Sequence, residues 1–277
     1  SNGAWNDAPM TPKDRMHTPE ARQEEMAWLQ RIGASGIKVD FFGGDKQAVM
    51  VLYDEILRDA ARFGLSVNFH GTTLPRGWSR MYPNFATNEA VRGMEFVTFD
   101  QPGADAQPVH CTVLPFTRNP VGPMDFTPVI VDQRLGPAGD GPHRRTRLSF
   151  ELALPVLYHS PVTHFGLTPS DRRLLPPAAE DYLREVPTVW DEVHYVDGYP
   201  GRFAALARRR GQQWWVAGIN GTQEEITFVL PEKLSGLPWL TLEDADFNQV
   251  AGGERGPHGA PIRLKPHGGV IMWTPGD

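Results

Sequence analysis

The chain has 277 residues, of which 40% are hydrophobic and 22% are charged. This composition is typical of a globular protein, and no run approaches the ~20 apolar residues of a membrane-spanning helix. The net charge is −6, and the longest basic run is 208–210, so nothing favours a nucleic acid as partner. The single cysteine, Cys111, excludes an intramolecular disulfide and a cysteine-based zinc site, and it fits a small buried hydrophobe better than a reactive thiol.

The first part of the chain alternates between helix and strand patterns. A helix is expected from Thr18, an N-cap followed by proline, to about Gly33, and a second helix over 46–63. Strands are expected at 36–42 and 65–70, where β-forming residues lie between these helices. Helices and strands that alternate with short connections predict a parallel sheet or barrel.

Beyond residue 70 the pattern is less regular. Long loops are expected at 71–88 and 101–122, and loops of this length on the active face of a barrel shape a substrate pocket. The other expected elements are strands at 92–97, 124–131 and 162–167, a helix at 144–159 that Pro155 interrupts, and a helix at 176–186.

From about residue 190, short strand-like runs are separated by turns, and no helix is expected. The runs lie at 203–208, 213–220, 225–230, 240–246 and 268–274. We therefore predict two domains, an α/β domain at 1–188 and an antiparallel β domain at 189–277. The chain starts abruptly, with Trp5 among turn residues, so a preceding part of the protein is expected.

Asp40 lies near the end of the first predicted strand, before Gly43-Gly44. The carboxyl ends of strands are where α/β barrels keep their catalytic groups, and two glycines let a ligand approach the backbone. Near the anomeric carbon of a sugar, such an anion can attack that carbon or stabilise positive charge there. The alternative is an aspartate that caps the next helix.

Glu95 lies between Met94 and Phe96 in a predicted strand. Alternation would turn it away from these apolar neighbours and toward the mouth of a barrel. Two carboxylates delivered to one mouth are the minimum equipment for cutting a glycosidic bond, one as nucleophile and one as acid/base. The alternative is a solvated strand glutamate.

His70 ends the second strand, and Glu89 lies six residues before Glu95. An imidazole and a carboxylate there could bind a sugar hydroxyl or a hard metal ion, although a structural histidine is the alternative. Further candidates for substrate binding are aromatic residues that could stack on a sugar or only pack, and polar residues that could orient hydroxyls or form a salt bridge. They are Trp5, Trp78, Tyr82, Arg118 and Asp125.

Seven motifs, in order, resemble glycoside hydrolase family 97, and together they cover nearly the whole chain. They are GIKVDFF at 36–42, VNFHG at 67–71, RMYPN at 80–84, EAVRGME at 89–95, LPFTRN at 114–119, MDFTP at 124–128 and VDGYPG at 196–201.

The resemblance implies an amino-terminal β-sandwich, a (β/α)8 barrel and a carboxy-terminal β module, with this chain beginning around the third barrel strand. The predicted fold is therefore a partial (β/α)8 TIM barrel followed by an antiparallel β-sandwich domain. The missing amino-terminal domain of the same protein is then a partner, and the resemblance implies a location in the periplasm or at the cell surface.

In the retaining branch of that family, the positions of Asp40 and Glu95 hold the nucleophile and the acid/base. Inverting members lack the aspartate and carry a glutamate where this chain has Gly71. Family members also bind calcium through glutamates matched by Glu89 and Glu95, with a further ligand from the sandwich.

The leading hypothesis is a retaining, exo-acting α-glycosidase, either an α-galactosidase or an α-glucosidase, that acts on terminal sugars of oligosaccharides. The alternative is a non-catalytic carbohydrate-binding module or an inactive fragment of such an enzyme. The sequence does not distinguish the two sugars, because they differ at one hydroxyl.

Overall fold

The structure is a computed structural model that describes residues 15–136, 139–255 and 260–276. It has a mixed α/β fold with a C-terminal antiparallel sheet, as predicted. Two compact units are present: unit 1 comprises Ser1–Arg92, Val121–Asp125 and Ser160–Val162, and unit 2 comprises Gly93–Pro120, Phe126–His159 and Thr163–Asp277. The domain boundary near residue 188 stays a prediction.

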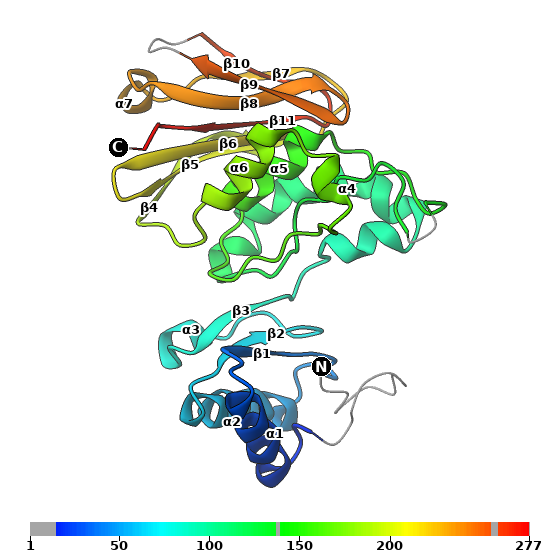
Figure 1. Cartoon of the computed structure of the whole chain (residues 1–277), viewed down its shortest axis with the longest axis vertical. Coiled ribbons are helices and arrows are strands. Elements are labelled where there is room, and N and C mark those ends of the chain that lie inside the picture. The colour runs from blue at the N-terminus through cyan, green and yellow to red at the C-terminus, as the bar shows by residue number, and fades with distance from the viewer. Residues whose placement is uncertain (1–14, 137–138, 256–259, 277) are drawn as a thin grey trace. The chain divides into compact units, whose positions relative to one another are not determined.

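Unit 1 contains a three-stranded sheet in the order β1-β2-β3, with both neighbouring pairs parallel. Helices α1 and α2 lie on one face of this sheet (Figure 1). The elements are α1 (Pro19–Arg31), β1 (Gly36–Val39), α2 (Gln47–Arg62), β2 (Ser66–Phe69), α3 (Trp78–Met81) and β3 (Phe85–Asn88). The predicted helices and strands before residue 70 are thus confirmed.

The local sequence explains α1 and α2. The Thr18 hydroxyl accepts a hydrogen bond from the Ala21 amide at 3.2 Å, which caps α1. One face of α2 is apolar and buried, and it packs with the sheet around Tyr53 and Phe69. Burying each such large side chain contributes roughly 1.5–3 kcal/mol. These elements hold the carboxyl ends of β1, β2 and β3 side by side.

Unit 2 contains a six-stranded sheet in the order β4-β5-β6-β11-β8-β9, and its adjacent strands are antiparallel. A separate pair, β10-β7, is also antiparallel. The strands are β4 (Glu192–Tyr199), β5 (Phe203–Arg210), β6 (Gln213–Asn220), β7 (Ile226–Phe228), β8 (Trp239–Asp246), β9 (Gln249–Arg255), β10 (Ile262–Leu264) and β11 (Gly269–Trp273).

The helices of unit 2 are mostly before the sheet in the chain. They are η1 (Met94–Thr98), α4 (Gln101–Val113), η2 (Leu114–Phe116), α5 (Leu148–Leu157), η4 (Asp171–Arg173), α6 (Pro177–Glu185) and α7 (Glu232–Ser235), while η3 (Asn119–Val121) ends where unit 1 resumes. Helices α5 and α6 lie along one side of the sheet (Figure 1). Cys111 of α4 is fully buried, as expected of a small hydrophobe.

Both faces of the central strands are covered. On the helix side, Tyr182 of α6 packs against Trp215 and Trp273 with ring centroids 6.0 and 5.6 Å apart. On the other side, Val216 and Met272 share a core with Phe228 of β7. This explains why every residue of β11 is buried. In strands with one solvent-exposed face, buried and exposed residues alternate.

Three predicted elements before residue 124 are wrong. Residues 71–88 are not one loop, because they include α3 and β3. Residues 92–97 form no strand but lead into the 3-10 helix η1, whose buried residues Met94 and Val97 are three positions apart. Residues 101–122 contain α4, which Asp100 caps by accepting from the Gly103 amide at 2.6 Å.

The later corrections concern strands. Residues 124–131 form only one bridge, Asn88 with Met124, because the backbone takes positive φ at Thr127 and Val129. Residues 162–167, all described, lie outside any strand. Helix α5 is shorter than predicted but passes through Pro155 unbroken. The five C-terminal runs are confirmed as strands, whereas β4, β9 and β10 were not predicted. The expectation of no helix beyond residue 190 is wrong, because α7 forms one short turn there.

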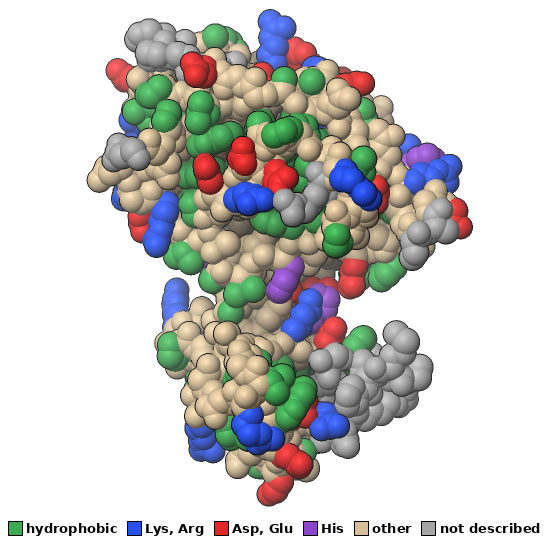
Figure 2. Space-filling model, in the orientation of Figure 1, with side chains coloured by type: hydrophobic (Ala, Val, Ile, Leu, Met, Phe, Trp, Pro, Cys, Tyr) green, Lys and Arg blue, Asp and Glu red, His purple; other side chains and the backbone are tan. Residues whose placement is uncertain are grey.

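In the part of the chain that the structure describes, no helix is both long and apolar enough to cross a membrane. Figure 2 shows Lys and Arg side chains interspersed with Asp and Glu on the face that it presents. An interspersed surface of this kind differs from the basic stripe that nucleic-acid-binding proteins carry.

Candidate active site

Asp40 follows β1 directly and is half-buried. Its Oδ1 accepts a hydrogen bond from the Phe41 amide at 2.6 Å. Phe41 has φ of 69°, a conformation uncommon for a residue with a bulky side chain. The turn after β1 therefore aims a backbone N–H at the Asp40 carboxylate.

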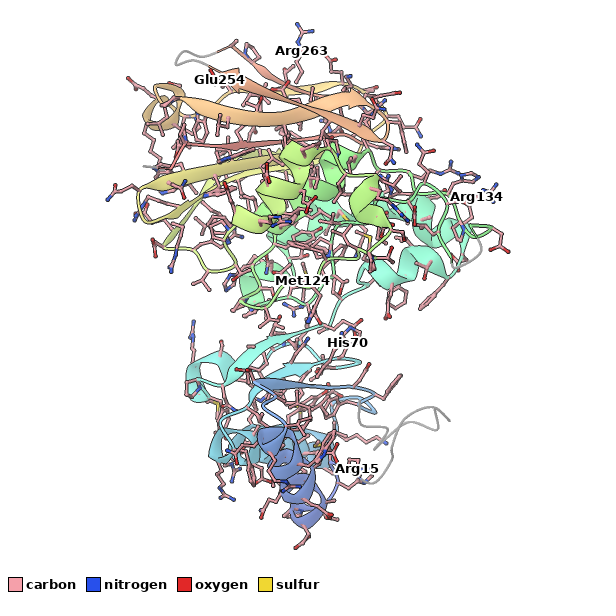
Figure 3. The ribbon with its side chains drawn as sticks, viewed as in Figure 1. Arg15, His70, Met124, Arg134, Glu254 and Arg263 are labelled. Atoms are coloured by element: carbon pink, nitrogen blue, oxygen red, sulfur yellow. The ribbon has the colours of Figure 1, made fainter. Side chains whose placement is uncertain are left out.

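His70, which is labelled in Figure 3, follows β2 and lies between two carboxylates. Its Nδ1 lies 3.3 Å from Asp40 Oδ2, and its Nε2 lies 3.2 Å from Glu89 Oε1. The His70 amide donates to the Val39 carbonyl at 2.8 Å, so the parallel pairing of β1 and β2 brings the ring to Asp40.

Glu89 follows β3 and is buried. Its amide donates to the Phe69 carbonyl at 2.8 Å, and its Oε2 accepts from the Gly71 amide at 2.8 Å. Asp40, His70 and Glu89, all three predicted as site residues, thus follow three neighbouring strands and form one cluster at the carboxyl edge of the sheet in unit 1.

The charges in this cluster stabilise one another. Burial alone would raise the pKa of Asp40, but the hydrogen bond and charge of His70, with the Phe41 amide and Lys38, lower it below its usual value. Burial would likewise lower the pKa of His70, but Asp40 and Glu89 outweigh it and raise that pKa. The cluster therefore holds Asp40 as an anion at neutral pH, as a nucleophilic carboxylate must be.

Asp125 joins the same edge through the segment Val121–Asp125. Its amide donates to the Asn88 carbonyl at 3.0 Å, and its buried Oδ2 lies 3.2 Å from Lys38 Nζ and 2.6 Å from Asn68 Nδ2. Sequence reasoning missed Lys38 and Asn68. Polar residues in otherwise apolar strands were the available signal, since the two are paired in the β1–β2 register.

Glu95 lies in unit 2, exposed on η1. The expected reason for its orientation, strand alternation, does not apply on a 3-10 helix. Arg118 is also in unit 2 and is 5% exposed, and burial lowers the pKa of its guanidinium to about 10. Because Arg118 is buried, it does not fit the surface salt bridge that was the alternative to substrate binding.

The aromatic candidates differ. Trp78 is 3% exposed and packs against Tyr53 and Phe85, with ring centroids 4.7 and 5.8 Å apart, which leaves its ring no open face for a sugar. Tyr82 is partly buried, and its hydroxyl donates to the Asp54 carboxylate on α2. Trp5 lies outside the described residues.

The calcium prediction can be compared with the oxygen atoms in unit 1. Calcium takes six to eight oxygen ligands. The two oxygens of Glu89 already contact the Gly71 amide and His70, and an imidazole offers no oxygen. Asp40, His70 and Glu89 alone therefore do not supply enough oxygen atoms for a calcium site.

Comparison with known proteins identifies the family. A family model described as glycoside hydrolase 97 matches residues 9–91. A second model, described as glycosyl-hydrolase 97 C-terminal, oligomerisation, matches residues 189–233. The chain belongs to glycoside hydrolase family 97. The first match contains Asp40, His70 and Glu89, and the second begins just before β4.

The curated relatives that the chain matches are longer than the chain. This chain is 37% identical to a probable retaining alpha-galactosidase of Streptomyces bingchenggensis. The 229 aligned residues cover 81% of this chain and 33% of the relative. This chain is also 33% identical to a retaining alpha-galactosidase of Bacteroides thetaiotaomicron. The 193 aligned residues cover 68% of this chain and 29% of that relative. The chain thus spans about a third of the length of the curated relatives it matches.

A solved structure matches almost the whole chain. The crystal structure of a beta-arabinopyranosidase superposes with a TM-score of 0.93 at 40% identity, over 98% of this chain and 44% of that one. The match supports the arrangement of elements described above within each unit.

Proposed function

We propose that the full-length protein is a retaining, exo-acting glycosidase in which Asp40 is the nucleophile and Glu95 is the acid/base. The observation that carries the proposal is the cluster at the end of the parallel strands, where His70 and the Phe41 amide hold Asp40 ionised. The curated relatives, whose names include the word retaining, support it.

The reaction proceeds in two steps. An Asp40 oxygen attacks the anomeric carbon while the glycosidic C–O bond breaks, and the Glu95 carboxyl gives its proton to the leaving oxygen. The Glu95 carboxylate then takes a proton from water, and this water oxygen replaces Asp40 at the anomeric carbon. Two inversions return the starting configuration and regenerate both carboxyl groups.

The proposed substrate is a terminal pyranoside with the configuration of galactose. The curated relatives are named as alpha-galactosidases and the solved structure as a beta-arabinopyranosidase. A β-L-arabinopyranoside has the ring stereochemistry of an α-D-galactoside and lacks only the hydroxymethyl group at C5. One pocket can therefore bind both, whereas a glucoside differs at the C4 hydroxyl.

The proposal includes the architecture and setting that the family resemblance implies. The strands β1, β2 and β3 would be consecutive strands of a (β/α)8 barrel that the rest of the protein completes. Calcium at Glu89 and Glu95 and a periplasmic or cell-surface location stay predictions. Calorimetric titration of the full-length protein and of Glu89→Gln with calcium tests the first.

The deciding experiment compares wild type with Asp40→Gly on nitrophenyl α-D-galactoside, β-L-arabinopyranoside and α-D-glucoside. We expect turnover to fall by on the order of 10⁴-fold or more, and azide to restore it with a glycosyl azide of inverted configuration. Asp45→Asn, at an exposed aspartate of the same unit, is the matched control and keeps wild-type rates.

Wild-type turnover in Asp40→Gly would rule out the nucleophile. Calorimetric binding of the free sugar by the wild type, without hydrolysis of any of the three substrates, would support a non-catalytic carbohydrate-binding module instead.

A further inference from the structure

Gly71 differs from the other left-handed glycines of unit 1. Its φ is +53°, and a Cβ built there would lie 2.8 Å from Asp40 Oδ1. A Cβ at Gly33, Gly44, Gly64 or Gly77 would meet nothing within 4 Å. Those four glycines serve the backbone conformation alone, whereas Gly71 also leaves space beside the carboxylate.

The backbone at residue 71 cannot retreat without breaking hydrogen bonds. The Gly71 amide donates to Glu89 Oε2 at 2.8 Å. The Gly71 carbonyl accepts from the Phe42 amide at 3.1 Å, and the preceding amide, that of His70, donates to the Val39 carbonyl at 2.8 Å. Residue 71 is thus held to the ends of β1 and β3 at once.

The Asp40 carboxylate is the group that would move if residue 71 carried a methyl group. The Cβ would also lie 3.0 Å from the Phe41 nitrogen and 3.2 Å from its Cα, but these are backbone atoms. The carboxylate is the free end of a side chain, so it would rotate away. That rotation breaks its 2.6 Å hydrogen bond from the Phe41 amide and its 3.3 Å contact with His70.

We propose that Gly71 is a positioning residue for the nucleophile: the absence of a side chain there keeps open the space that Asp40 Oδ1 occupies. The inference rests on the proposed role of Asp40. Gly71 touches no reacting atom, and it acts through Asp40 and through Glu89, which its amide holds in place.

The test begins with Gly71→Ala in the full-length protein. Displacing a reacting group by about 1 Å can cost 10²-fold in rate, so we expect kcat to fall by about that factor with little change in KM. Gly64→Ala is the matched control, because its φ of +68° brings the same backbone strain without a neighbour within 4 Å. It should keep wild-type kcat.

The second arm separates positioning from general damage. In the Asp40→Gly background the carboxylate is gone, and azide acts as an external nucleophile. Because the two residues are in contact, their effects should be coupled. Adding Gly71→Ala to Asp40→Gly should change the azide-rescued rate by less than about 3-fold.

An equal loss from Gly71→Ala in both backgrounds would overturn the inference, since a structural defect does not depend on Asp40. Wild-type kcat in Gly71→Ala would overturn it as well. Absence of turnover in the wild type, or full turnover in Asp40→Gly, would instead remove the proposed function on which it rests.

Discussion

Asp40 in unit 1 and Asp244 in unit 2 are both aspartates withdrawn from water, yet their pKa values shift in opposite directions. Burial raises the pKa of Asp244 to about 6, and the Ser149 hydroxyl, 2.6 Å from Oδ1, together with the charges of Arg147 and Lys265, offsets only part of this effect. At Asp40 burial acts the same way, but the charge and hydrogen bond of His70 outweigh it. The direction of the pKa shift therefore depends on whether the groups that favour the anion outweigh the effect of burial, as they do at Asp40 but not at Asp244.

Glu151 in unit 2 extends the comparison. Burial raises its pKa, although Arg144, the Thr146 hydroxyl, the Ile130 amide and Gln107 all favour the anion. It accepts hydrogen bonds inside the core and joins α5 to neighbouring segments. The buried carboxylates of Asp244 and Glu151 serve packing in unit 2, whereas Asp40 lies at a strand end where a ligand can approach.

The largest expected effect comes from removing the His70 ring that contacts Asp40. His70→Ala should lower kcat by about 10²- to 10³-fold, the usual result of losing one preorganised hydrogen-bond donor. His70→Gln keeps a donor and should recover part of the rate. Steady-state kinetics of the full-length variants measure this, and wild-type kcat in His70→Ala would show that Asp40 needs no such partner.

In unit 2 the matching substitution should affect stability instead. Glu151→Ala leaves the groups that donate to this carboxylate without an acceptor, and should lower the free energy of unfolding by about 3 kcal/mol. Glu151→Gln keeps acceptor oxygen and should cost much less. Urea denaturation followed by tryptophan fluorescence distinguishes them, and equal losses would mean that the charge itself matters.

Asp244 predicts a pH dependence with a definite sign. Its folded pKa of about 6 lies above the ordinary value of 3.8, so the folded state binds the proton more tightly. The contribution of Asp244 to the free energy of unfolding is therefore fully present below about pH 4. It is lost as pH rises to about 6, by on the order of 3 kcal/mol at most. Asp244→Asn should remove that slope in urea titrations, and an unchanged slope contradicts the assignment.

The smallest effect concerns the Asp40–His70 pair. The lowered pKa of Asp40 gives stability that is lost as pH falls through a value below 3.8, and the raised pKa of His70 gives stability that is lost as pH rises through a value above 6.5. Between these limits unit 1 should be most protected. Amide hydrogen exchange in β1 and β2, compared with Asp40→Asn, measures this window, and identical pH profiles would argue against it.

Much of unit 1 could be predicted because its signals are local. The cap at Thr18 and the apolar face of α2 define the helices, and two polar strand ends place Asp40 and His70 on one edge. That Lys38 and Asn68 both meet Asp125 follows from their pairing in the β1–β2 register, which the sequence does not state. Asp125 was a candidate from sequence, but its position depends on the non-local segment Val121–Asp125.

Prediction failed where tertiary contacts override local pattern. Helix α4 contains Gly103 and Pro108, which ordinarily indicate a loop. The segment 124–131 is rich in β-forming residues, but positive φ values at Thr127 and Val129 prevent a ladder. The spacing of three between the apolar residues Met94 and Val97 was the sequence signal that Glu95 lies on a helical turn, and both residues are buried.

Cys111 provides a built-in reporter for this protein. It is the only cysteine in the sequence, it is fully buried in unit 2, and burial raises the pKa of its thiol. Modification by a thiol reagent therefore requires α4 to open. The rate of labelling measures how often this helix exposes its core side to solvent, without any engineered probe.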